Sequence, residues 1–225
     1  MSDYKLDNPV WYSLSETHQH LAIEYNDAKF YKPDYCPFGG FAAAAKSTHA
    51  VEQYSSLADN FFIVGEKPLM PPQLSIKKDL VCLQMICDKK IQIAPTETIL
   101  KLDKEHSQSL YELVQRVQPG YFREKTYLLG DYYGIFVHDK LVAVTGERMQ
   151  MNDLTEVSAV VTDPGYTGKG FAKQLLAHTV NHIFKQNKVP FLHVAETNLS
   201  AIHLYEKLGF KLRRKISFWN IVREQ

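Results

Sequence analysis

The chain has 225 residues, of which 45% are hydrophobic and 23% charged, so it can bury a core in one large domain or two small ones. A formal charge of +1 argues against a strong non-specific nucleic-acid binder, which would carry a basic stripe, and we expect no nucleic-acid partner. The 3 cysteines favour free thiols in a reducing compartment. No apolar run approaches the ~20 residues of a membrane span, and the start lacks a signal-peptide core. We therefore expect a cytoplasmic protein with no membrane partner.

The first part of the chain, residues 1–94, is aromatic and irregular, and Pro95 marks a boundary to a more regular part. The aromatic and Pro-rich segment 30–41 predicts a loop, which either covers a core or lines a pocket. We interpret 1–94 as a smaller α/β lobe that is either a degenerate copy of the following domain or a substrate lid. Apolar patterns within it predict helices over 9–25 and 48–59 and strands over 61–64 and 80–87.

From residue 97 onward the order of predicted elements is strand, helix, three strands, helix, strand, helix and strand. Asn198 is expected to cap the last helix and Gly209 to end it. This order predicts an α/β fold with a mixed, mainly antiparallel central sheet and helices on both faces. The strands are expected over 98–102, 132–137, 141–149, 155–161 and 191–195, and the helices after 103, over 168–186 and over 199–208.

The junction between the strand 155–161 and the helix 168–186 carries the strongest chemical signal. Gly168 and Gly170 have no side chain to block an approaching ligand, and their amides would point out of a positive helix end. This predicts an anion site suited to a pyrophosphate, although a strand, glycine turn and helix can also be a packing device. Neither a P-loop nor a Rossmann fingerprint is present.

Two motifs in the second part resemble those of the GNAT superfamily of acyl-CoA-dependent N-acyltransferases. The run TGKGFA over residues 167–172 resembles the Q/R-x-x-G-x-G/A motif, with Thr167 in place of Gln or Arg. The run NLSAIHLYEKLGF over residues 198–210 resembles the N-x-x-A-x-x-L-Y-x-x-x-G-F motif. Both occur in the expected order and about thirty residues apart. The resemblance identifies residues 95–225 as a GNAT acetyltransferase domain.

What this resemblance implies is an acetyl-CoA co-substrate in a cleft between the strands 155–161 and 191–195. The pyrophosphate would lie on residues 168–172, and the pantetheine arm would pair with backbone at 160–162. No metal is expected, since His178 and His182 lack a third ligand. The residues implied in cofactor binding are Val160, Val161, Thr162, Thr167, Gly168, Lys169, Gly170, Phe171, Ala172, Asn198, Ser200, Ala201 and Tyr205.

Two residues are candidates for proton transfer. Tyr205 occupies the position of the usual acid in the GNAT motif and would protonate the leaving thiolate, unless it only packs on the core. Glu156 lies eleven residues before Thr167, as does the catalytic glutamate of the histone-acetyltransferase branch, and is the first candidate for the base. The alternative is a carboxylate paired with a neighbouring cation. Glu147 and His193 are rival bases, and a backbone N–H in 157–161 would polarise the acetyl carbonyl.

The expected function is therefore transfer of an acetyl group from acetyl-CoA to a primary amine of a small molecule, amino acid or peptide by direct attack. A non-catalytic acyl-CoA-binding sensor is an alternative. The two-lobe layout also resembles glycine N-acyltransferase-like proteins, which leaves an amino-acid N-acyltransferase with a longer acyl-CoA as another alternative. The sequence leaves the acceptor and the oligomeric state open.

Overall fold

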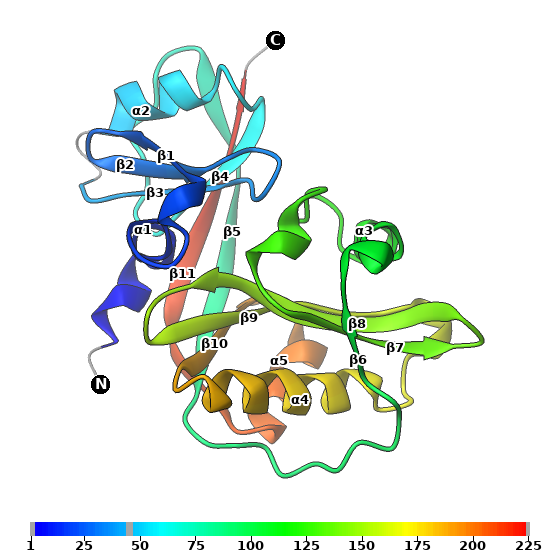
Figure 1. The fold of residues 1–225 in the computed structure, drawn as a ribbon. Coiled ribbons are helices and arrows are strands. Elements are labelled where there is room, and N and C mark those ends of the chain that lie inside the picture. Colours follow the sequence, from blue (N-terminus) through cyan, green and yellow to red (C-terminus); the bar gives the residue numbers. More distant parts are fainter. Residues whose placement is uncertain (1–2, 44–46, 224–225) are drawn as a thin grey trace.

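The computed structural model describes residues 3–43 and 47–223, and Figure 1 shows how their elements are arranged. The strands are β1 (Ala22–Tyr25), β2 (Ala28–Tyr31), β3 (Phe38–Phe41), β4 (Asn60–Val64), β5 (Leu74–Cys87), β6 (Leu100–Leu102), β7 (Tyr132–Val137), β8 (Lys140–Gln150), β9 (Leu154–Thr162), β10 (Val189–Ala195) and β11 (Phe210–Arg223). The α-helices are α1 (Pro9–Ser15), α2 (Ser47–Tyr54), α3 (Ser107–Val117), α4 (Phe171–Lys185) and α5 (Leu199–Lys207).

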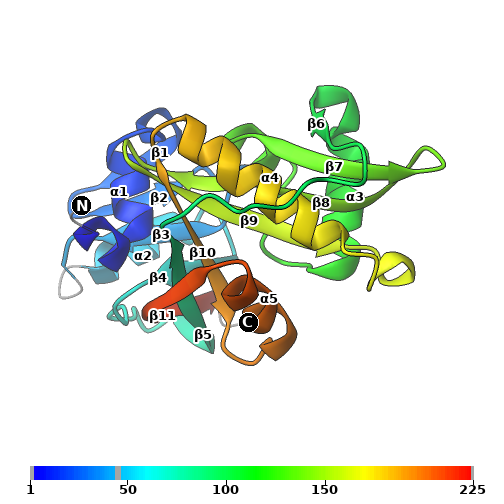
Figure 2. The ribbon, with the colours of Figure 1, turned by 90° about the horizontal axis from the view of Figure 1, so that it is seen from below.

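The strands of the described residues form one mixed sheet in the order β1-β2-β3-β4-β11-β5-β10-β9-β8-β7-β6. Within it β9 and β10 are parallel, as are β3 and β4, and the other pairs are antiparallel. Helices α3 and α4 lie on opposite faces of the β7–β9 part (Figures 1 and 2). The predicted fold class and the order of elements after residue 97 are both confirmed.

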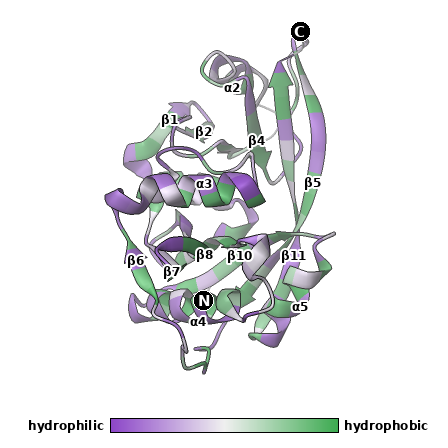
Figure 3. Ribbon diagram, turned by 90° about the vertical axis from the view of Figure 1, so that its right-hand side faces the viewer, coloured by the Kyte–Doolittle hydropathy of each residue, from purple (hydrophilic) through white to green (hydrophobic). Residues whose placement is uncertain are grey.

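The two covering helices bury one side each because their apolar residues recur at helical spacing. Both carry hydrophilic as well as hydrophobic residues along their length (Figure 3). Leu110 and Val114 of α3 pack with Val144 of β8, and Leu176 and Val180 of α4 pack with residues of β9 and β10. The strand β9, which carries the expected site, therefore lies between two apolar layers.

The N-terminal lobe shares its sheet with the second part of the chain. Strand β5 lies between β10 and β11 and is antiparallel to both, and β11 also pairs with β4. In Figure 1 the long strands β5 and β11 run from the lower part of the molecule up to the lobe that holds α2. The predicted boundary at Pro95 therefore does not separate two sheets. Strand β5 precedes Pro95, and both of its edges are hydrogen-bonded to strands that follow Pro95.

The irregular first part contains more strand than its sequence suggests. The expected loop over 30–41 includes the end of β2 and all of β3, and the expected helix over 9–25 ends at Ser15 before β1 begins at Ala22. These short strands are stabilised by distant partners, since β3 pairs in parallel with β4. Local propensity carries little information about such long-range pairing.

Candidate active site

A cleft opens where β9 and β10 separate. The two parallel strands are paired only over Leu154–Glu156 and Val189–Phe191, at the start of each strand. Beyond that point residues 157–162 of β9 line a cavity of about 450 Å³ together with residues 192–195 of β10. Asn198 also lines the cavity, as do Phe38 and Lys78 of the N-terminal lobe. The structure thus forms a cleft between the two strands that the sequence predicts.

A bulge in β9 shapes this cleft. The register shifts between the pairs Val144–Val161 and Gly146–Ser158, and Ala159 has a φ of +49°. A left-handed φ is rare for a residue with a side chain and marks a backbone held by its surroundings. Such a bulge leaves the extra residue out of the ladder, so its backbone groups can face a ligand.

The glycine turn forms an open cradle before α4. Gly168 and Gly170 adopt φ values of +78° and +77°, which favour glycine, and an added Cβ at either would meet nothing within 4 Å. Helix α4 begins at Phe171, later than predicted, because these two residues are not helical. The N–H groups of its first turn have no partner within the helix and carry a partial positive charge. The side chain of Phe171 is buried in the core, so only its backbone can serve the cradle.

Cations lie along the turn that leads from Asp163 to the cradle. Lys140 and Arg116 form ion pairs with Asp163 at 2.9 Å and 3.0 Å, and Asp163 also accepts a hydrogen bond from the N–H of Gly165. Lys169 lies over the ring of Tyr166, with its Nζ atom 5.0 Å from the ring centre. The carboxylate of Asp163 is thus paired with two cations, which weakens its repulsion of an anion at the cradle.

Thr167 has a local structural contact where the family motif has Gln or Arg. Its Oγ1 atom donates a hydrogen bond to the carbonyl of Pro164 at 3.2 Å. This bond ties the turn to the 3-10 helix Pro164–Tyr166 and leaves the backbone amides free to bind the ligand.

Helix α5 brings three of its four predicted residues to the cavity. Asn198 caps the helix by accepting a hydrogen bond from the N–H of Ala201 at 3.2 Å, and both residues line the cavity. Tyr205 also lines it, and no described residue hydrogen-bonds its hydroxyl. Burial raises the pKa of Tyr205 above its ordinary value of 10.0, so the phenol stays protonated at neutral pH. Ser200 is exposed and does not line the cavity.

Glu156 is buried in a bidentate ion pair. Arg148 donates to it from Nε at 2.8 Å and from Nη2 at 2.7 Å, and His193 Nδ1 lies 2.8 Å from its Oε1 atom. Burial alone raises the pKa of Glu156, but the charge of Arg148 and the hydrogen bonds from Arg148 and His193 outweigh it and lower the pKa to about 2. A carboxylate with both oxygens engaged and so low a pKa is poorly suited to removing a proton from an amine. The geometry therefore opposes the predicted role of Glu156 as the base.

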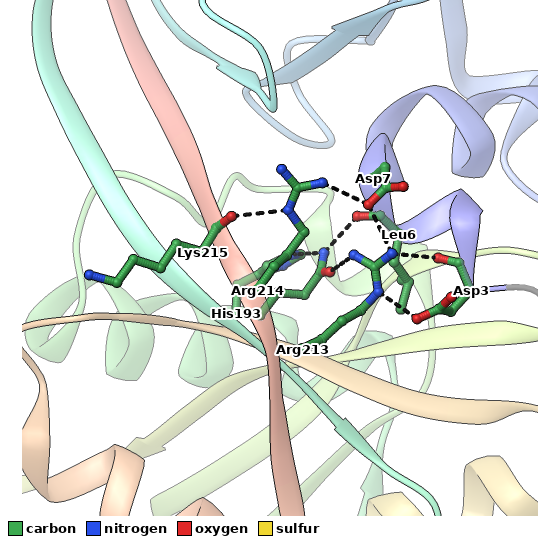
Figure 4. Close-up of polar contacts among 8 residues, drawn as sticks. Asp3, Leu6, Asp7, His193, Arg213, Arg214 and Lys215 are labelled. Atoms are coloured by element: carbon green, nitrogen blue, oxygen red, sulfur yellow. Dashed lines mark hydrogen bonds and ion pairs between the residues drawn. The ribbon is translucent and has the colours of Figure 1, made fainter.

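His193 is locked by a hydrogen-bond network that reaches the N-terminal segment (Figure 4). Its Nε2 atom lies 3.0 Å from Nε2 of Gln84, which also donates to the carbonyl of Leu6 at 2.8 Å. The Oε1 atom of Gln84 accepts from Arg213 at 2.9 Å, and Arg213 is bound in turn to Asp3. The amide must therefore donate to His193, whose proton lies on Nδ1 toward Glu156. Both ring nitrogens are engaged, which leaves His193 no free position for an amine.

Glu147, the other rival base, lies outside the cavity. It is 1% exposed, its Oε2 atom accepts from Gln150 at 3.2 Å, and its Oε1 atom has no hydrogen-bond partner among the described residues. Burial and then the charge of Asp131 raise its pKa from 4.5 to about 7. Since neighbouring strand residues face opposite sides of a sheet, Glu147 points away from the side that Arg148 faces.

Substituting Glu147 is expected to stabilise the protein at neutral pH. A carboxyl whose pKa is raised on folding binds more protons in the folded state, so its cost appears as the pH rises from 4.5 to about 7 and is full above that range. We expect Glu147→Gln to raise the free energy of unfolding by about 2 kcal/mol at pH 8 and to change it little at pH 4. Urea unfolding at both values of pH measures this, and a larger gain at pH 4 would contradict it.

Arg148 and Gln84 are site residues that sequence reasoning missed. A signal for Arg148 was available, because an arginine in the apolar strand β8 needs a buried partner, and Glu156 lies on the neighbouring strand β9. Gln84 carries no such signal, since its role depends on the segment Asp3–Asp7 folding back onto β5 and β11.

Two further findings concern metals and membranes. The described residues contain no cluster of His, Cys, Asp and Glu that could hold a metal ion. His182 is paired with Asp131 at 3.1 Å, and the ring of His178 packs on Tyr133. Within the described ranges, no helix is both long and apolar enough to cross a membrane.

Comparison with known proteins decides the family. Residues 132–219 match the family model described as FR47-like protein. A solved structure from Novosphingobium aromaticivorans, assigned to the GNAT family of acetyltransferases, is 30% identical, covers 98% of this chain and 99% of its own, and superposes with a TM-score of 0.90. The chain belongs to the GNAT family.

Curated relatives of this GNAT protein are N-acetyltransferases. The ribosomal protein bS18 alanine N-acetyltransferase of Escherichia coli is 29% identical over 119 residues, which is 50% of this chain and 80% of the relative. The spermidine N(1)-acetyltransferase of Vibrio cholerae is 39% identical over 54 residues, or 23% of this chain and 31% of the relative. The protein is thus an acyl-CoA-dependent N-acetyltransferase, as its two motifs predict.

Proposed function

We propose that this GNAT protein transfers an acetyl group from acetyl-CoA to a primary amine by direct attack in the cleft between β9 and β10. The observation that carries the proposal is the set of residues that this cleft brings together. The bulged strand β9, Tyr205 and residues of the N-terminal lobe line one cavity, and the open glycine cradle follows β9 along the chain. We place the protein in the cytoplasm, in keeping with its three free and buried cysteines.

The residues present fit the proposed co-substrate. An added Cβ at Gly168 or Gly170 would project into open space, so this space can accept a pyrophosphate against the first turn of α4. The Nδ2 atom of Asn198 has no partner among the described residues and is free to bind the arm. Acetyl-CoA, when bound, would supply an acetyl thioester whose C–S bond breaks as the amine nitrogen bonds to the acetyl carbon.

The chain's own residues would then handle the charges and protons. A backbone N–H in the bulged part of β9 would stabilise the developing charge on the carbonyl oxygen. Tyr205 would donate its hydroxyl proton to the leaving thiolate. Glu156 would fix Arg148 and His193 rather than act as the base. Since no carboxylate among the described lining residues is available, the amine would lose its proton to water in the cavity.

The test of this proposal is Tyr205→Phe. The ring keeps its packing and only the hydroxyl is lost, so cofactor affinity should change little. We expect kcat to fall about 10²-fold, since general acid catalysis is worth at least that much. The measurement is release of CoA thiol with a panel of primary amines, together with acetyl-CoA affinity by calorimetry.

The same experiment separates an enzyme from an acyl-CoA-binding sensor. Tyr166→Phe is a matched control, because this tyrosine stacks with Lys169 near the cradle and does not line the cavity. Full activity of Tyr205→Phe would show that Tyr205 only packs in the core and is not the acid. Tight cofactor binding without turnover on any amine would favour the sensor.

A further inference from the structure

Arg148 has hydrogen-bond donors that its ion pair with Glu156 does not use. Its Nε and Nη2 atoms are bound to Glu156, and its guanidinium carbon lies 4.6 Å from the centre of the Phe38 ring. Its Nη1 atom takes part in no hydrogen bond or ion pair with any residue of 3–43 or 47–223, and Arg148 lines the cavity. A guanidinium with one edge fixed keeps its other N–H groups in a defined plane, where they suit a second carboxylate.

Lys78 is the second cation among the described residues that line the cavity. It lies on β5 with Leu80 and Cys82, at alternate positions that all line the cavity. Its side chain is exposed, and within the described chain it has no ion-pair partner. The exposed ammonium of Lys78 and the guanidinium that Glu156 holds in place therefore both line one cavity, and both attract an anion.

The rest of this wall is uncharged and largely aromatic. The lining residues here are Phe38 of β3, Phe218 of β11 and Tyr121, and the ring of His193 lies against Phe218. None of the described lining residues is an aspartate or glutamate. A cationic acceptor such as a polyamine would therefore meet two positive groups and no carboxylate, at a cost in binding.

We propose that the acceptor is an α-amino acid with a large apolar or aromatic side chain, bound through its carboxylate by Arg148 and Lys78. This rests on the proposed transfer to a primary amine. The aromatic wall would hold the side chain, and the carboxylate contact would orient the amine toward the bulge in β9. Glu156 contributes by keeping the guanidinium in one orientation, so it acts as a positioning residue.

Binding of two unreactive probes tests the carboxylate contact without turnover. The probes 3-phenylpropanoate and 3-phenylpropanamide share a ring and differ in charge. Calorimetry on the full chain with CoA should show at least tenfold tighter binding of the carboxylate. Lys78→Gln should reduce this preference at least threefold. Lys77→Gln removes the same charge one position away, where the side chain does not line the cavity, and should leave the preference intact.

A second test of the proposal compares the turnover of amines with and without a carboxylate. We expect kcat/KM for phenylalanine to exceed that for phenethylamine at least tenfold and that for spermidine by more. Equal binding of the two probes, or no binding of either, would overturn the inference, as would faster acetylation of spermidine. Acetylation of amines without a carboxylate preference would leave the proposed function standing. Tight acetyl-CoA binding with no turnover on any amine would defeat the proposed function, while the probe measurements would still decide the carboxylate site.

Discussion

Gly170→Asp is expected to abolish acetyl-CoA binding while the protein remains folded. The added carboxylate would point into the open space before α4, where we propose the pyrophosphate lies. Two unit charges 4 Å apart repel by about 4 kcal/mol at an effective dielectric constant of 20, which corresponds to a loss of roughly 10³-fold in affinity. Aspartate also tolerates a left-handed φ better than most residues, so the turn should persist. Calorimetric titration with acetyl-CoA measures the loss.

The matched control for this substitution is Gly170→Asn. Asparagine has nearly the same shape and the same tolerance of the left-handed region, but it carries no charge. We expect its affinity to lie between those of the wild type and the Asp variant. Unchanged thermal unfolding of both variants would show that the fold is retained. If the affinity of Gly170→Asp for acetyl-CoA were within threefold of the wild-type value, the proposed binding of the pyrophosphate at the cradle would be wrong.

Glu156→Gln is expected to destabilise the protein by about 3–5 kcal/mol, because it leaves the buried Arg148 without its counter-charge. For a chain of this length the loss corresponds to a fall in Tm of roughly 10 °C. The contribution of Glu156 to the stability of the fold depends on pH, in the direction that its lowered pKa sets. A carboxyl with a lowered pKa stabilises the fold above its unfolded value of 4.5, and that stability is lost as the pH falls toward 2. Urea unfolding at pH 7 gives the magnitude.

Two companion variants show whether the loss of stability in Glu156→Gln comes from the unpaired charge of Arg148. Arg148→Gln combined with Glu156→Gln removes both charges and should recover most of the stability, since two amides can hydrogen-bond and no buried charge is left unpaired. Glu196→Gln breaks an exposed pair with Lys215 and should cost less than about 1 kcal/mol. A loss of similar size in the Glu196 variant would mean that burial of the Arg148 pair is not the cause.

The pH–rate profile of Glu156→Gln separates the two roles considered for this residue. A general base would lose activity at neutral pH and regain it at high pH, where free amine arises unaided. The observed ion pair leads us to expect profiles of the variant and the wild type that run parallel, once they are corrected for the folded fraction. Recovery confined to high pH would restore Glu156 as the base.

The sequence by itself determined the family and the order of elements after residue 97, and it predicted the glycine cradle at which we propose the cofactor binds. These features are local, because a glycine turn, a helix cap and an amphipathic helix are each encoded within a few neighbouring residues. Gly168 and Gly170 could be assigned to a cradle since only glycine readily adopts their backbone conformation. Asn198 could be assigned as a cap for a similar local reason.

Only the tertiary structure shows the contacts on which the proposed acceptor end and proton chemistry rest. Whether Glu156 is a base or one half of an ion pair depends on Arg148 across the sheet and on His193 of β10. The tautomer of His193 depends on Gln84 and on the N-terminal segment that reaches it through Leu6. Strand β5 enters between β10 and β11 from before Pro95, so even the extent of the sheet was hidden from local patterns. The pKa and availability of a buried group are set by partners distant in the chain, and only the folded arrangement brings those partners together.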